Sequence, residues 1–206
     1  MTNPEILKLF IQKEVKQVSQ EFLADTMCYL EKEKKGEVIK TLLYSFENVL
    51  QNCKRKGKLP DIRYIQLSLK RAKALKLEPF YQLELFDDQF ILNEVIESDE
   101  VDFDWIYEEY RLYCEKIDQQ SKRYFQQIEN SALTRIKLAQ LITCNKIVKH
   151  ILVEGIVHII NLDIFQEMPL EQGIQIQIGE YRGAYQIVFT SDQYTKKIGK
   201  LWYGIL

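Results

Sequence analysis

The chain has 206 residues, with 28 Lys and Arg against 30 Asp and Glu, a formal charge of −2 and 46% hydrophobic residues. This composition is typical of a globular chain, and it excludes both a whole-molecule polycation and an acidic disordered tail. Average usage would supply roughly 14 Gly and roughly 10 Pro, whereas the chain has 8 and 4. The shortage of turn residues predicts long helices and few loops.

Three features of the sequence bear on the compartment of the protein. Charged residues interrupt the N-terminal segment 1–17, so neither a signal peptide nor a transit peptide is predicted. The most apolar stretch, 147–162, is too short and too polar to span a bilayer. The four cysteines form no CxxC pair, which argues against a zinc or redox site. We therefore expect a soluble cytoplasmic protein with reduced, mostly buried thiols, no membrane association and no cofactor.

The N-terminal segment 3–57 predicts two helices. Asn3 and Pro4 are typical of a helix start, as an N-cap acceptor followed by a proline at the first position. Apolar residues then recur every three or four positions, and basic residues precede both Gly36 and Gly57, as at helix C-termini. A short connection around Gly36 predicts an antiparallel helical hairpin.

The pattern changes from helical to alternating after Pro60. Residues 64–69 and 81–85 alternate apolar and polar side chains, and a short apolar run follows at 90–92. These patterns predict a small antiparallel sheet within 61–93. Residues 70–77 fit either a strand or one or two turns of helix.

A long helical pattern occupies 104–162. Asp104 is a suitable N-cap, and apolar residues recur at intervals of eleven, which indicates a nearly straight helix. The helix could break near Asn130 and Ser131. Its aromatic residues make one broad face, which we interpret as a packing surface for other helices or for a second copy of the chain.

The C-terminal tail 173–206 is predicted to be rich in β-structure. Alternation at 174–178 and a second β-rich run at 185–189 flank a segment that can turn, which predicts a hairpin. The last six residues, LWYGIL, would expose large apolar side chains unless something covers them. The predicted fold is α+β, predominantly α, in a single domain spanning 1–206.

The strongest non-random feature is the distribution of charge. Residues 54–76, here the basic segment, hold nine bases and one acid, whereas residues 78–110, the acidic segment, hold twelve acids and no base. The two segments could neutralise each other within the chain, or the basic segment could bind nucleic acid or an acidic protein. The candidate nucleic-acid-binding residues are Lys54, Arg55, Lys56, Lys58, Arg63, Lys70, Arg71 and Lys73.

Two clusters could hold a metal ion. Both histidines share a helix with a carboxylate, and His150, Glu154 and His158 lie at successive intervals of four, which places them on one stripe. This histidine stripe could bind a transition metal or supply a general base, or it could simply be the polar side of a packed helix. The second cluster, here the acidic group, comprises Asp99, Glu100, Asp102 and Asp104. Its carboxylates could hold Mg²⁺ or Ca²⁺, or they could serve only to favour a helix start.

No stretch of the sequence matches a catalytic or cofactor motif. The leading hypothesis is therefore a non-enzymatic interaction or scaffold protein that self-associates. A nucleic-acid-associated factor using the basic segment is the alternative, and a metal protein or enzyme centred on the histidine stripe is the third possibility.

Overall fold

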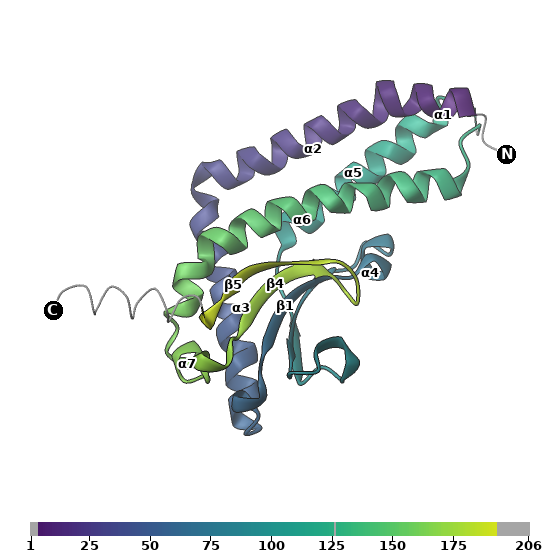
Figure 1. Ribbon diagram of the computed structural model, residues 1–206. Coiled ribbons are helices and arrows are strands. Elements are labelled where there is room, and N and C mark those ends of the chain that lie inside the picture. The colour runs from purple at the N-terminus through teal and green to yellow at the C-terminus, as the bar shows by residue number, and fades with distance from the viewer. Residues whose placement is uncertain (1–3, 126, 193–206) are drawn as a thin grey trace. The chain divides into compact units, whose positions relative to one another are not determined.

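A computed structural model of the protein describes residues 4–125 and 127–192 (Figure 1). It combines long helices with one mixed sheet, which confirms the predicted α+β class with helix predominant. The described residues fall into two compact units. The first unit is drawn from 1–37, 71–80 and 103–148, and the second from 38–70, 81–102 and 149–206. The prediction of a single domain for 1–206 stays a prediction.

The N-terminal segment is helical without interruption. It comprises α1 (Pro4–Phe10), the π-helical turn η1 (Ile11–Val15), α2 (Lys16–Tyr29), the π-helical turn η2 (Leu30–Lys34) and α3 (Lys35–Arg55). The predicted turn at Gly36, and with it the helical hairpin over 3–57, is wrong: the backbone continues in right-handed helical conformation through Lys35 and into α3. A glycine costs a helix only about 1 kcal/mol, and here it is flanked by strong helix formers. Asn3, the predicted N-cap, lies outside the described residues.

In the first unit, aromatic rings join the N-terminal helices to α5 (Asp104–Lys122). The ring pairs are Phe22 with Tyr113, at 6.0 Å between centroids, and Tyr29 with Trp105, at 6.1 Å. An ion pair of 3.0 Å between Lys116 and Glu21 adds to this contact. The aromatic face of the predicted long helix is therefore largely a helix-packing surface.

The helical segment predicted over 104–162 is two helices with a break between them. The first, α5, ends at Lys122, and α6 (Asn130–Ile160) begins at one of the two residues where the break was expected. The Tyr110 hydroxyl donates to the Lys137 carbonyl at 3.1 Å, which ties the two helices together. The N-cap of α5 is Phe103 and no side-chain cap is formed. The prediction of Asp104 as N-cap is therefore wrong by one residue, although its charge still lies in the first turn, where the helix dipole favours it.

The second unit is built on a five-stranded sheet with the order β3-β2-β1-β4-β5. Its strands are β1 (Tyr64–Leu69), β2 (Tyr81–Phe86), β3 (Glu97–Glu100), β4 (Gln175–Glu180) and β5 (Tyr185–Thr190). The predicted hairpin of the tail is β4–β5. The small sheet was predicted to be antiparallel throughout, but β1 pairs with β4 in parallel and so joins both predicted pieces into one mixed sheet (Figure 1). Alternation predicts that a strand exists but not which distant strand it pairs with.

Short helices fill several connections between these elements. The 70–77 segment forms α4 (Arg71–Leu75) in the first unit, one of the two alternatives left open by the sequence. The apolar run 90–92 is the 3₁₀ turn η4 (Phe90–Leu92) rather than a strand. The remaining short helices are η3 (Leu59–Asp61), α7 (Asp163–Gln166) and η5 (Leu170–Gln172).

The two faces of the sheet differ in chemistry. The apolar residues of β1, β2 and β4, such as Ile65, Leu83 and Ile176, are fully buried. The opposite face carries a buried polar cluster of Gln66, Ser68, Glu84 and Gln177, each at most 2% exposed. Within the cluster the Ser68 hydroxyl donates to Glu84, and Lys70 lies 3.1 Å from the same carboxylate. The second unit thus has a polar as well as an apolar interior.

No helix within 4–125 or 127–192 is long and apolar enough to cross a membrane.

Candidate functional site

The basic segment is divided between the two units. Lys54 to Lys70 belong to the second unit, and Arg71 and Lys73 lie on α4 in the first. Three of its cations form ion pairs: Lys54 with Glu167 at 2.5 Å, Lys56 with Glu97 at 2.5 Å and Lys70 with Glu84 at 3.1 Å. Two of these three carboxylates belong to the acidic segment, which favours the interpretation that the segments neutralise each other.

Two of the three remaining bases of the basic segment in the second unit, Arg55 and Arg63, have local partners. Arg63 donates to the carbonyl oxygens of Pro60 and Ile62, at 2.7 and 2.8 Å. Arg55 donates to Asn52 at 3.3 Å, and Lys58 lies exposed after the end of α3. Nucleic-acid binding by the basic segment stays a prediction.

The histidine stripe lies on the part of α6 that belongs to the second unit. His150 Nε2 lies 3.2 Å from Glu154 Oε1, and both histidines are exposed. Among the residues that the structure describes, no three His, Cys, Asp or Glu side chains are grouped so that they could hold a metal ion. The stripe therefore presents one His–carboxylate pair on a helix surface.

The acidic group is spread over a strand and a helix start. Asp99 lies on β3 and accepts a hydrogen bond of 2.7 Å from Asn48 on α3, whereas Asp104 opens α5 in the first unit. Successive residues of a strand point to opposite faces, so the carboxylates of Asp99 and Glu100 do not converge.

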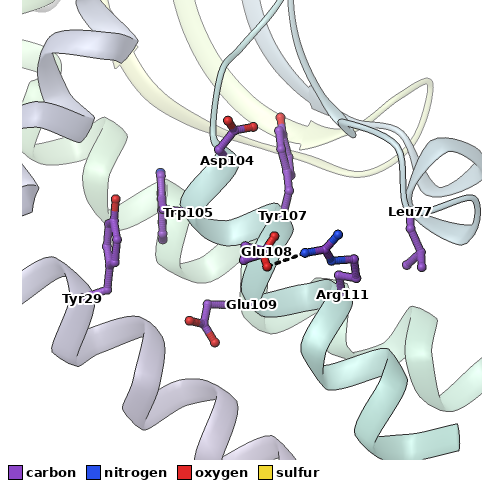
Figure 2. Close-up of a pocket in the computed structure, with 8 residues that line it drawn as sticks. All are labelled: Tyr29, Leu77, Asp104, Trp105, Tyr107, Glu108, Glu109 and Arg111. Carbon is purple, nitrogen blue, oxygen red and sulfur yellow. Dashed lines mark hydrogen bonds and ion pairs between the residues drawn. The ribbon is translucent and has the colours of Figure 1, made fainter.

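A cavity of roughly 390 Å³ lies at the start of α5 in the first unit (Figure 2). Its walls come from α2, from the residues that follow α4 and from the first two turns of α5. The lining residues are Tyr29, Leu77, Asp104, Trp105, Tyr107, Glu108, Glu109 and Arg111. These eight include three carboxylates and one guanidinium but no Ser, Cys or His, the usual nucleophiles.

The charge of this cavity is negative. Three of its residues are carboxylates and one is a guanidinium, and Arg111 is bonded to Glu108 (Figure 2). The carboxylate of Glu109 points away from that pair (Figure 2) and has no ion pair within the described residues. Burial raises the pKa of the Glu109 carboxyl above its ordinary value, and the nearby Asp25 raises it further. The cavity therefore holds a partly desolvated carboxylate that a cation would stabilise.

The aromatic walls of the cavity are also suited to a cation. The rings of Tyr29 and Trp105 are nearly parallel, with 12° between their planes. The Lys34 ammonium lies 4.6 Å from the centroid of the Tyr29 ring, a cation–π contact. Trp105 is 8% exposed, and its Nε1 donor has no acceptor among the described residues.

The helical spacing of these aromatics predicted a packing surface, and the cavity was not predicted. The signal available was the alternation of acids and aromatics in 104–110, DWIYEEY. That alternation cannot show that Tyr29 and Leu77, from distant parts of the chain, complete the wall.

The two edges of the sheet differ in charge. β3 forms one edge, and three of its four residues, Glu97, Asp99 and Glu100, are acidic. β5 forms the other edge, and its sequence YQIVFT carries no charge. Tyr185 and Ile187 on β5 are 47% and 52% exposed. Among the described residues, β5 is paired on one side only.

Comparison with known proteins gave no relative: no family model matches the chain, and no curated protein or solved structure is detectably similar to it.

Proposed function

We propose that this protein is a non-enzymatic interaction protein that assembles with a second copy of itself through the free edge of β5. The observation that carries the proposal is the contrast between the two sheet edges. Proteins commonly protect sheet edges with charged residues, because an unprotected edge pairs with other strands. The β3 edge has that protection, whereas the β5 edge has neither a charge nor a proline. One register shift, between the pairs Ile176–Phe189 and Gln177–Ile187, interrupts the β4–β5 ladder and leaves Tyr185 to Ile187 as a regular stretch.

The backbone of β5 has outward hydrogen-bonding groups for such pairing. At the turn, the Glu180 N–H donates to the Ala184 carbonyl at 2.9 Å, so residues 180 and 184 form a hydrogen-bonded pair. Because such pairs alternate along an antiparallel ladder, the N–H and C=O groups of Tyr185 and Ile187 face away from β4. Two copies of β5 could then pair antiparallel across a two-fold axis.

Charge explains why the partner is a second copy through β5 rather than through β3. In a two-fold pairing each strand meets its own sequence, so every charge faces a like charge nearby. Copies of β3 would bring six carboxylates together, whereas copies of β5 bring none. Self-pairing is therefore favoured at β5 and opposed at β3.

The test is the oligomeric state of a variant with a charge on this edge. Ile187→Lys places two like charges close together at the axis, and we expect the dimer dissociation constant to rise at least about tenfold, or ~1.4 kcal/mol. Light scattering and sedimentation velocity over a hundredfold dilution measure this constant. The control is Val157→Lys, which places the same charge at an equally exposed apolar position on α6 and should leave association unchanged.

A monomer at every concentration would contradict the proposal. Equal weakening by both substitutions would also contradict it, because the effect would then reflect general charge. Residues 193–206, which include the predicted apolar tail, lie outside the described residues. If the wild type were monomeric and the β5 amides were protected from hydrogen exchange, a segment of the same chain would be the occupant of the edge.

A further inference from the structure

We propose that the cavity at the start of α5 binds an organic cation, a guanidinium or a quaternary ammonium group. The cavity lies in the first unit and β5 lies in the second. This proposal is therefore independent of self-association, and each can fail while the other holds.

The first argument is electrostatic. Arg111 neutralises Glu108, which leaves Glu109 as a carboxylate with no ion pair among the described residues. Burial and the charge of Asp25 disfavour its ionised form, and the charge of Lys116 opposes them more weakly, so the pKa of Glu109 is raised. Burial of a carboxylate without a partner costs free energy, and a bound cation removes that cost. The cavity therefore selects for positive charge.

The second argument concerns the type of cation. Small metal ions take several oxygen ligands, whereas this cavity is lined by the aromatic residues Tyr29, Trp105 and Tyr107 beside its carboxylates. Aromatic faces favour large, weakly hydrated cations such as guanidinium and alkylated ammonium. The Lys34 ammonium over the Tyr29 ring shows that one of these rings already contacts a cation in this fold.

Trp105 lines the cavity and is more than nine-tenths buried. Its Nε1–H has no acceptor within the described residues, but this atom is covered by other protein atoms. A ligand in the cavity would therefore contact the ring of Trp105 rather than this donor, so the indole serves as the reporter of binding.

The experiment follows the fluorescence of Trp105 during titration with defined cations. The chain has two tryptophans, so a Trp202→Phe background leaves Trp105 as the single indole reporter. The probes are N-acetyl-arginine amide and tetramethylammonium chloride. N-acetyl-citrulline amide, the neutral isostere of the first probe, and sodium chloride at matched ionic strength are the ligand controls. We expect saturable binding with a dissociation constant on the order of 1 mM.

The decisive variant is Glu109→Gln, which removes the charge and keeps the shape of the side chain. We expect it to weaken cation binding about tenfold. The matched control is Glu115→Gln, the same substitution at an exposed position of α5 that does not line the cavity. Circular dichroism of both variants verifies that the helices are retained.

The two probes also distinguish the source of the cation. Tighter binding of N-acetyl-arginine amide assigns the site to a basic side chain of a protein partner, and tighter binding of tetramethylammonium assigns it to a free quaternary ammonium compound. Equal binding of the arginine and citrulline probes, no saturable change, or equal effects of the two Glu→Gln substitutions would each overturn the proposal.

Discussion

Two glycines of the second unit illustrate how local space determines the effect of one methyl group. Gly155 lies inside α6, and a Cβ there would lie 3.5 Å from Leu42 and 3.7 Å from Ile39, ordinary contact distances. We expect Gly155→Ala to stabilise the protein by about 1 kcal/mol, because alanine favours the helix and no neighbour must move. Urea unfolding measures this change.

The matched substitution is Gly179→Ala on β4. A Cβ there would lie 2.3 Å from the Ala184 carbonyl oxygen, so the backbone of the hairpin would have to shift. We expect a loss of about 1 to 3 kcal/mol. A destabilising Gly155→Ala would show that α3 approaches α6 more closely than the structure has it.

At the scale of elements, Gly36 tests the uninterrupted N-terminal helix. Apart from its chain neighbours and the backbone of its own helix, no atom of the described residues lies within 4 Å of where its Cβ would be, and the surrounding backbone is right-handed helix. Gly36→Ala should therefore raise the free energy of unfolding by about 1 kcal/mol and leave the far-ultraviolet circular dichroism unchanged. If Gly36 instead ended a helix in left-handed conformation, as at Gly57 with φ 69°, alanine would destabilise the protein.

The elements themselves were largely predictable from the sequence, because periodicity is a local property. Alternation located β1, β2 and the β4–β5 hairpin, and the eleven-residue period located the helices on both sides of the break at Asn130. Basic residues before a glycine were ambiguous: they mark the end of α3 near Gly57 but not an end at Gly36.

The candidate site was less predictable than the elements. Its acids and aromatics on α5 were visible, but the other walls are Tyr29 and Leu77. Their meeting depends on tertiary packing between α2, α4 and α5, which no spacing in the sequence encodes. The strand β3 was missed for a related reason: its residues ESDE have low strand propensity, and pairing with β2 imposes the conformation.

At the scale of the whole molecule, the buried cysteine thiols allow the unfolding of each unit to be followed separately. Burial raises the pKa of Cys53 in the second unit and of Cys114 in the first to about 11, and it also raises the pKa of Cys144. Cys28 is exposed. Because the thiolate is the reactive form, native protein at pH 8 should be labelled by a maleimide at Cys28 alone.

The same labelling in increasing urea tests whether the units unfold together. The division between the units falls inside both α3 and α6, so the loss of one unit would fray helices of the other. We expect Cys53 and Cys114 to become reactive at the same urea concentration, as measured by peptide mass spectrometry. Separate transitions would contradict the prediction of a single domain.

The parallel pairing of β1 with β4 sets an order in which the second unit can be completed during synthesis. Ile65 pairs with Ile176, roughly 110 residues later, which a ribosome needs about 5 to 20 seconds to add. Until then β1 has β2 as its neighbour on one side, and its other side, a strand of sequence YIQLSL without charge, is open to solvent. The nascent chain thus carries an unprotected strand edge for about half of its translation, and premature termination before residue 175 would leave that edge permanently available for aggregation or for capture by a chaperone.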